Sequence, residues 1–476
     1  MKKSILILIV LTSAMSLYSQ TLEDGLRLTR KENGASARSN ALGLSYQGIN
    51  DDGAALYFNP AGLFLIPTSE IQMGVNVKYI KSYIDYLGND FTNDRSNQNL
   101  SNFTFVAPLG DDENRMTFAI GYFRDFNYDD QLNFSAFNQN GSFIRNQSDN
   151  GNYLVSDLGL APYDSPGLSP ITDSLKQNYS LKLEGANSKF SMGLALSLGK
   201  KAALGFSYSL HTADYSNYRK LDEIDVHNKY NFNDSENFTN VDFNYLNSDV
   251  KFSQNITGHT GTVGFMLTPT ENSRAFISVD LPTFYMFEDT YKEEYYVNFD
   301  NNENSSLTNN GKISYNVATP FRFNFGASYN IIGITVSGAM SYMDMTNLKF
   351  SEPRNSQVVT GDRDFFDNIN QTIDERLASA KIDWGIGAEY KFPLYPVFLR
   401  ASYSSKNTPY REGFRDLSTI KTLAVGAGFL VSDKIMLDAS LSNSKFDETY
   451  FAYSNQAYFI DRNNTNVFIG FSYRFN

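Results

Sequence analysis

Apolar and polar positions alternate along most of the chain, a pattern typical of β-strands that have one face in an apolar environment. The C-terminal stretch NVFIGFSYRF places Val467, Ile469, Phe471, Tyr473 and Phe475 on one face. The same period of two recurs in KIDWGIGAEYKF, PFRFNFGASY and ALGFSYSLH. The pattern therefore predicts an all-β protein.

The alternation predicts fourteen strands, and their connections alternate in length. Short turns such as GKK, PLYP and VSDK follow even-numbered strands, whereas longer loops rich in Asn, Asp and Ser follow odd-numbered ones. This sorting is typical of outer-membrane barrels and has no reason to occur in a soluble sandwich with Greek-key connections. The predicted strands cover residues 70–83, 99–107, 115–126, 188–198, 202–213, 249–267, 274–287, 312–328, 332–347, 380–392, 396–405, 418–430, 434–445 and 465–475.

A barrel of this size has two physical requirements. In lipid, every backbone polar group must be paired within the protein, which antiparallel closure achieves. Fourteen strands also enclose a lumen wider than side chains fill, because the diameter grows with strand number. The segment before the first strand, residues 21–67, is available as a small plug or hatch, so the barrel itself is predicted over 68–476.

The N-terminus predicts export. Residues 1–20 combine Lys2 and Lys3 with a short apolar run from Ile5 to Leu11 and a polar end, which is the layout of a removable signal peptide. No later stretch has the roughly 18 uninterrupted apolar residues of a transmembrane helix. The predicted location is the outer membrane, as a multi-pass β-barrel.

Composition narrows the class of partner. The chain has 31 Tyr and 38 Phe but one Trp, an excess of aromatic residues that suits the girdles of a membrane barrel. The formal net charge of −12 argues against nucleic acid, which requires basic surfaces. The absence of cysteine excludes disulfides and a lipid anchor on cysteine.

The stretch DDGAALYFNPAGLFLIP at 51–67 departs from the alternation. Asp51 or Asp52 can cap a helical turn that begins at Gly53, by accepting bonds from free N–H groups. Pro60 ends the turn, because a proline restricts the residue before it, here Asn59. A compact element of small and apolar residues suits a lumen better than lipid or open water.

At this point the chain resembles a known family. GASARSNALGLSYQGINDDGAALYFNPAGL, followed by fourteen strands, is similar to the FadL family of outer-membrane transporters for long-chain fatty acids and other hydrophobic compounds. The resemblance covers the whole chain in layout, looks closest to the Bacteroidetes branch, and is most specific at 34–63. The hatch motif that it implies consists of Asp51, Asp52, Asn59, Pro60, Ala61 and Gly62.

The resemblance implies a mechanism of passive uptake. Ligand binds first in a groove among the extracellular loops, then at a tighter site in the lumen, and hatch movement releases it. A kink in the third strand opens a lateral gap in the wall. In the third strand here, RMTFAIGYFRDF, Gly121 is the residue most able to permit a kink, although it can equally be a small lumen-facing residue.

The loop after the third strand, NYLVSDLGLAPYDSPGLSP, is a candidate ligand groove. Its apolar residues are expected to face water, and exposed apolar clusters mark binding surfaces. The alternative is that they pack the loop against its neighbours. The groove candidates are Tyr153, Leu154, Val155, Leu158, Leu160 and Leu168.

Several charged residues face the lumen if the alternation holds, and two roles are open for them. They pair with neighbouring strands, which is favoured, or with the hatch through Arg38, Asp51 or Asp52. An inward arginine would also suit the carboxylate of a ligand. These inward residues are Arg322, Glu389, Lys391, Arg400 and Arg474.

Catalytic chemistry is not expected. The three histidines, His211, His227 and His259, pair with no serine at a recognisable spacing. We therefore predict a protein that is not an enzyme and has no cofactor, metal or catalytic residue. The predicted partners are hydrophobic small molecules such as fatty acids and detergent-like compounds, with outer-membrane lipids and lipopolysaccharide around the barrel.

One alternative function has the same architecture. FadL-like barrels also act in protein secretion or surface attachment, as components of the type IX secretion system, and would bind secreted proteins. The long regions 127–187 and 212–248 fit either a ligand groove or a surface for docking proteins. A third possibility, an open porin, conflicts with the hatch.

Overall fold

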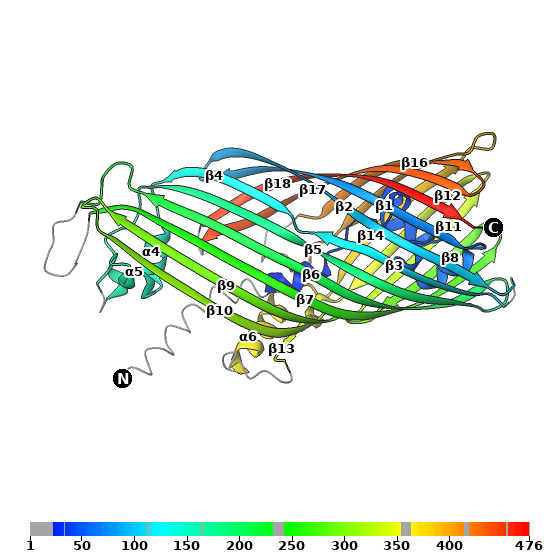
Figure 1. The fold of residues 1–476 in the computed structure, drawn as a ribbon, viewed down its shortest axis with the longest axis horizontal. Helices are drawn as coiled ribbons and strands as arrows, with labels where there is room; N and C mark the ends of the chain where they lie inside the picture. Colours follow the sequence, from blue (N-terminus) through cyan, green and yellow to red (C-terminus); the bar gives the residue numbers. More distant parts are fainter. Residues whose placement is uncertain are drawn as a thin grey trace.

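The computed structural model describes residues 22–32, 34–111, 114–162, 165–231, 242–353, 363–413, 418–453 and 456–475. The predicted signal peptide at 1–20 lies outside these ranges. The described chain is mostly β-strand and forms one elongated barrel (Figure 1). No helix in the described part is both long enough and apolar enough to cross a membrane.

In the described part of the chain, eighteen strands form a single sheet, and each pairs antiparallel with its neighbours. They are β1 Glu70–Tyr86, β2 Asn89–Leu109, β3 Met116–Asn127, β4 Asp130–Asn138, β5 Leu175–Ser197, β6 Ala202–Ile224, β7 Phe243–Thr270, β8 Ser273–Asp280, β9 Phe284–Phe299, β10 Asn304–Ala318, β11 Arg322–Ile331, β12 Ile334–Met343, β13 Lys349–Ser351, β14 Lys381–Lys391, β15 Val397–Lys406, β16 Ile420–Ser432, β17 Ile435–Tyr453 and β18 Gln456–Arg474.

Fourteen of these strands close a ring at the end of the barrel where the short turns lie. β4, β9, β10 and β13 lie beyond this ring, and the remaining strands pair in sequence from β1 to β18. β18 then pairs with β1, from Glu70↔Arg474 to Asp85↔Phe459, so the described ring has no edge. The predicted fourteen-stranded antiparallel barrel is confirmed.

Two of the strand breaks have a simple cause. β8 and β9 are separated at Pro282, and β10 and β11 at Pro320. A proline has no N–H to donate to the ladder, so pairing is interrupted there. The upper part of the wall then continues with β9 and β10, which pair with each other.

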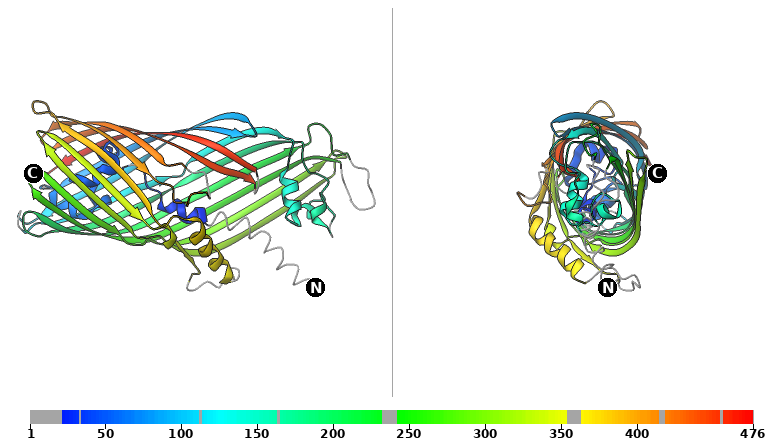
Figure 2. Two further views of the ribbon diagram at one scale, coloured as in Figure 1. Left: turned by 180° about the vertical axis from the view of Figure 1, so that it is seen from behind. Right: turned by 90° about the vertical axis from the view of Figure 1, so that its left-hand side faces the viewer.

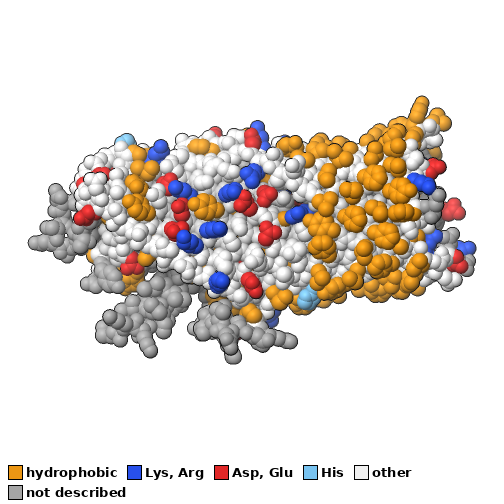
Figure 3. Space-filling model, viewed as in Figure 1, with side chains coloured by type: hydrophobic (Ala, Val, Ile, Leu, Met, Phe, Trp, Pro, Cys, Tyr) orange, Lys and Arg blue, Asp and Glu red, His pale blue; other side chains and the backbone are white. Residues whose placement is uncertain are grey.

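An apolar belt surrounds the ring. Its side chains project outward from the halves of the strands nearer the short turns, called the lower halves here, and form the broad hydrophobic zone in Figure 3. Exposing a zone of this size to water is unfavourable, so the belt is the part of the barrel that spans the membrane. Among its exposed members are Leu100, Phe118, Phe190, Met192, Phe325, Trp384, Ile386, Leu423 and Ile469.

On the side of the long loops, the wall continues beyond the belt, and this part is called the upper tier. β5, β6 and β7 run from the belt into this tier, which carries mixed charges on its outer surface (Figure 3). The sequence located only the lower part of some strands: the second was predicted at 99–107, whereas β2 spans Asn89–Leu109. Its upper half, NDFTNDRSNQN, is almost entirely polar and gives no alternation of polarity.

Short helices occupy the inside of the barrel and its loop end (Figure 2). Residues 22–29 are also helical. The segment 34–66, called the hatch below, contains four of these helices and lies inside the ring. The helices are α2 Ala37–Leu42, η1 Gly43–Gly48, α3 Ala55–Phe58 and η2 Pro60–Leu65 in the hatch, α4 Phe143–Asp149, α5 Leu154–Asp157 and η3 Pro166–Leu168 at the loop end, and η4 Met345–Asn347 and α6 Arg363–Arg376 beside β13.

Local sequence explains how the hatch begins and turns. Ser36 accepts a bond from the N–H of Ser39, and the Ser39 hydroxyl accepts in return from Ser36, which forms a capping box for α2. Gly43 ends α2 in a conformation with φ of 53°. Asp52 Oδ1 accepts from the N–H of Ala54 at 2.9 Å, as expected for the turn after Gly53.

Candidate functional site

At several points the hatch approaches the wall closely because small residues lie on both sides, and elsewhere larger side chains such as Tyr57 pack on the wall. Ala37, Ala41 and Ala61 are fully buried. A Cβ added at Gly205 would lie 2.0 Å from the backbone N of Ala61, and one added at Gly426 would lie 2.6 Å from the Cβ of Ala41. The inward-facing glycines therefore make room for the hatch.

The Asn-Pro-Ala-Gly motif joins the hatch to β8. Asn59 Oδ1 accepts from the N–H of Ala61 at 3.0 Å, and its Nδ2 donates to the carbonyl of Ile277 at 3.1 Å. Pro60 occupies the first position of η2, where its missing N–H has no cost. A Cβ at Gly62 would lie 2.1 Å from the Asn50 carbonyl, so only glycine fits this turn.

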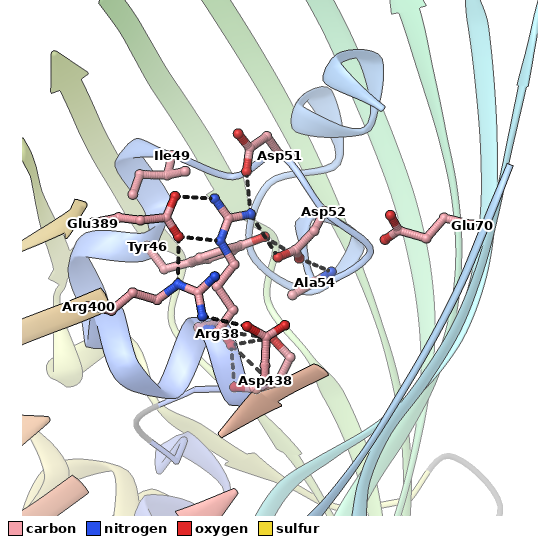
Figure 4. Close-up of polar contacts among 12 residues, drawn as sticks. Arg38, Tyr46, Ile49, Asp51, Asp52, Ala54, Glu70, Glu389, Arg400 and Asp438 are labelled. Carbon is pink, nitrogen blue, oxygen red and sulfur yellow. Dashed lines mark hydrogen bonds and ion pairs between the residues drawn. The ribbon is translucent and has the colours of Figure 1, made fainter. Parts of the chain in front are cut away.

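Arg38 is the centre of a buried network of charges (Figure 4). Its guanidinium donates to Asp51 at 2.6 Å and to Asp52 at 3.1 Å, within the hatch. It also forms two bonds of 2.9 Å with Glu389 of β14. One side chain of the hatch therefore joins two of the predicted motif residues to the barrel wall.

The network continues across the wall. Arg400 of β15 lies 2.6 Å from Glu389 and 2.5 Å from Asp438 of β17. Gly428 on the intervening strand leaves the space through which Arg400 reaches, because a Cβ there would be 2.9 Å from its Nη1. Both pairings left open by the sequence occur: Glu389 pairs with the hatch and with a neighbouring strand.

Asp51 has a second wall partner. Its Oδ2 lies 2.6 Å from Nη1 of Arg274, at the start of β8. Burial disfavours the ionised carboxylate, but the guanidinium groups of Arg38 and Arg274 hold the pKa of Asp51 well below its usual range. Asp52, in addition to its bond with Arg38, accepts from the hydroxyl of Tyr46 at 2.6 Å. The two aspartates therefore share Arg38 and differ in their second partner.

The segment that leads into the hatch is also tied to the wall. Arg27 pairs with Asp24 at 2.6 Å and lies 3.4 Å from the ring centroid of Tyr215. Lys31 pairs with Asp280 at 3.1 Å. The contacts with Tyr215 and Asp280 were not predicted, because partners so far apart in the chain leave no local pattern.

The third strand is irregular, but not at the predicted glycine. Gly121 keeps regular pairing with Thr104 and Ser191. The register shifts between Arg124 and Phe126, and β2 pairs with β3 only as far as Asn102↔Phe123. Two fully paired neighbours hold the chain straight at Gly121, whereas pairing with β2 has already ended where the register shifts. The role of Gly121 stays a prediction.

The bulged residue Asp125 faces the lumen and is buried there. Its Oδ2 lies 3.3 Å from Nδ1 of His211, and its backbone carbonyl accepts from the N–H of Glu32 at 2.9 Å. The lead-in segment therefore contacts the third strand at its irregular point. Among the described residues, no group of three or more His, Cys, Asp or Glu side chains would hold a metal ion.

The predicted exposure of the ligand groove was wrong. Leu158 and Leu160 are 1% and 3% exposed, and Leu154 and Val155 are also buried. The loop folds over the mouth of the barrel, so these side chains pack against wall residues instead of water. Only Leu168, at 66%, is strongly exposed, while Tyr153 is partly buried. Their role in ligand binding stays a prediction.

Comparisons with known proteins agree with this geometry. A FadL homologue of Pseudomonas aeruginosa superposes with a TM-score of 0.55 and 12% identity, over 94% of this chain and 98% of that chain. The toluene transporter TodX of Pseudomonas putida gives 0.54 and 14%, over 93% and 99%. This chain has the FadL fold.

The likeness concerns the fold, since the identities are low. Scans against protein-family models and curated proteins found no match. The sequence resemblance to the FadL family implied a hatch inside a fourteen-stranded ring, and the structure has this arrangement. What the channel admits must be argued from its own residues.

Proposed function

We propose that this chain is an outer-membrane channel of FadL type, through which hydrophobic compounds pass inward when the hatch leaves its position. The compounds expected from the sequence resemblance are long-chain fatty acids. Monoaromatic hydrocarbons are a second class, because the similar TodX structure is described as a toluene transporter. Passage depends on diffusion and needs no catalytic group.

The observation that supports this proposal is the hatch in the ring. Small residues bring it close to the wall, an apolar cluster joins Tyr57 to wall residues such as Phe123, and polar links come from Arg38, Asp51 and Asn59. Buried ion pairs fix a position specifically while contributing little net stability, because desolvation offsets their attraction. A plug of this kind is well positioned and still displaceable.

The third strand supports a lateral exit, as the resemblance implies. Hydrogen bonding between β2 and β3 ends at Asn102↔Phe123, near the upper border of the belt. Above it, β2 and β4 are joined through the side chain of Asn93, which bonds the backbone of Asn133 at 3.0 and 2.9 Å. Side-chain links are more easily broken than a continuous ladder.

Uptake measurements test the proposal. Cells that produce the full chain should accumulate radiolabelled palmitate, toluene or both faster than cells with the empty vector, while uptake of a labelled sugar should be unchanged. Equal uptake of all three would contradict the proposal. If, in addition, secreted proteins copurify with the barrel, the alternative function in protein secretion or surface attachment would replace it.

A further inference from the structure

The loop end of the barrel is covered by a folded segment whose two ends join neighbouring strands side by side. This segment, called the cap, consists of residues 139–162 and 165–174 and contains α4, α5 and η3. It leaves the wall after Asn138 and returns before Leu175, and these two residues are partners in the β4–β5 ladder. Rotation of the cap about this pair would leave the strand ladder of the wall intact, although it would break the bonds of Asp173 with Lys229 and Tyr230, which follow β6.

The underside of the cap fills the mouth of the barrel. Ile144, Leu158 and Leu160 belong to one apolar cluster with the wall residues Tyr179 and Tyr295. Figure 2, in the view along the barrel, shows α4 and α5 lying across the opening. An apolar compound that enters beneath the cap would displace these side chains.

A wall carboxylate holds the start of α4. Glu223, near the end of β6, accepts from the N–H of Phe143 at 2.6 Å and from the N–H of Ile144 at 3.2 Å. Its third donor is Nε2 of Gln177 at 2.6 Å. Within the described residues, this buried carboxylate forms no ion pair with a Lys or Arg side chain.

Other polar groups complete the surroundings of Glu223. The hydroxyl of Tyr453 on β17 accepts from Gln177 Nε2 at 3.0 Å, and the hydroxyl of Tyr86 on β1 bonds the other end of the same amide. Burial raises the pKa of Glu223 to about 7, since hydrogen bonds alone offset only part of the desolvation. The Glu223 carboxyl group therefore changes its protonation state near neutral pH.

We propose that the cap is the outer gate of the channel, turning about the Asn138–Leu175 pair, with Glu223 as the latch that holds α4 when the gate is closed. The gate admits apolar compounds, because only such compounds can replace the apolar underside of the cap over the aromatic wall. Its role in uptake rests on the proposed function, but its movement does not.

A crosslink tests whether the gate must open. The rings of Phe143 in the cap and Tyr295 in β9 stack at 6.3 Å, and the chain has no cysteine of its own. A Phe143→Cys, Tyr295→Cys variant is joined with a short bifunctional thiol reagent. Tyr245→Cys with Tyr296→Cys is the matched control, because these rings also lie 6.0 Å apart but belong to two wall strands.

Crosslinking the cap should reduce uptake of palmitate and toluene at least tenfold relative to the same variant without reagent, whereas the crosslinked control should lose little. Uptake that is unchanged by the cap crosslink would overturn the gate and leave the proposed function intact. Migration of folded and heated samples on gels confirms that each variant is a barrel.

A distance measurement tests the gate without any uptake. Spin labels on Leu168→Cys in the cap and Lys292→Cys on the outer face of β9 should give two distance populations in wild-type background. Glu223→Gln should enlarge the longer one severalfold, because the amide nitrogen cannot accept from Ile144. One narrow population in both proteins would overturn the gate. Two populations without uptake of any compound would refute the proposed function alone.

Discussion

The hatch and the cap close the same barrel by different physical means. The hatch approaches the wall closely at alanines and glycines and shares one apolar cluster with it, and charged contacts, such as those of Arg38 with Glu389 and Arg274 with Asp51, fix its position. The cap meets the wall through large apolar side chains, with one carboxylate, Glu223, at the start of α4. Close approach and charge define a single position, whereas apolar packing tolerates many small displacements.

This difference suits the two ends of a channel. At the cap, an apolar compound can replace an apolar side chain with little change in the free energy of burial. At the hatch, the same compound cannot satisfy the charges that it displaces, so the hatch must move as a folded unit. The comparison makes four predictions, which follow from the largest expected effect to the smallest.

Filling the space of a wall glycine should expel the hatch altogether. In Gly205→Val, the new side chain would overlap the backbone of Ala61, which cannot yield as the end of a flexible side chain does. The conductance of the purified barrel in planar bilayers should rise severalfold. Gly338→Val is the control, because a Cβ there makes only ordinary contacts, at 3.7 Å and beyond. Equal conductance of the two variants would mean that the hatch is not seated by this contact.

Charges in the core of the cap should release the cap and leave the hatch in place. Replacing Leu158 and Leu160 with Asp removes buried apolar groups and buries carboxylates, at a cost of about 3–5 kcal/mol or more. Added protease should then cut within 139–162, while the barrel stays intact on gels. Leu168→Asp, at an exposed position, should remain resistant. If the double variant resists the protease, apolar packing of Leu158 and Leu160 does not hold the cap on the barrel.

Removing the central arginine should loosen the hatch without expelling it. Arg38→Ala leaves Asp51 with Arg274 and Glu389 with Arg400, so the loss should be about 3 kcal/mol, the low end for a broken buried ion pair. Amide hydrogen exchange in α2 and α3 should accelerate about a hundredfold. Arg145→Ala, which removes an exposed pair with Asp149, should change exchange by less than about fivefold. Unchanged exchange in Arg38→Ala would show that the network does not hold the hatch.

The cap should respond to pH between about 5 and 7, whereas the hatch should not. The closed cap raises the pKa of Glu223 to about 7, and opening returns this group to water and its ordinary value. The closed state therefore holds the proton more tightly, and opening becomes more favourable, by about tenfold per pH unit at most, as pH rises through this range. The titratable neighbours Tyr86 and Tyr453 remain protonated there, since burial raises the pKa of each.

The distance distribution between the labelled cap and β9 measures this response. The open population should grow with pH in the wild-type background and stay constant in Glu223→Gln. The hatch differs because the pKa of Asp51 is lowered, so its ion pairs are lost only as pH falls well below the usual range of an aspartate. A pH response of the cap that survives in Glu223→Gln would remove Glu223 as the latch.

How much of this could be predicted from sequence depends on what each residue faces. Where a strand faces lipid on one side and the lumen on the other, apolar and polar residues alternate with a period of two. The sequence therefore located the strands within the belt. The upper half of β2 has water-exposed polar residues on its outer face and polar residues inside, and no period marks it. The fold was predictable because the membrane simplifies the pattern.

The site was predictable only where its geometry is local. Asp52, Asn59 and Pro60 act on residues close in sequence, as capping rules require. Arg38 and Glu389 are 351 residues apart, and alternation placed Glu389 on the inner face but could not decide between Arg38 and a neighbouring strand as its partner. The exposure of Leu158 was mispredicted because the loop acquires part of its core from strands far along the chain, here β9 and β18.

The most direct test of the account is to lock the hatch reversibly and measure uptake. A Cβ at Gly470 would lie 3.1 Å from the Cβ of Ala37, so Ala37→Cys with Gly470→Cys can form a disulfide after a shift of a few tenths of an ångström. Ser191→Cys with Ser209→Cys is the control, because these hydroxyl oxygens lie 2.7 Å apart between two wall strands. Oxidation of the first pair should stop uptake of palmitate and toluene, and reduction should restore it, with no effect in the control. Uptake that continues with the hatch locked to the wall would contradict a channel opened by hatch movement.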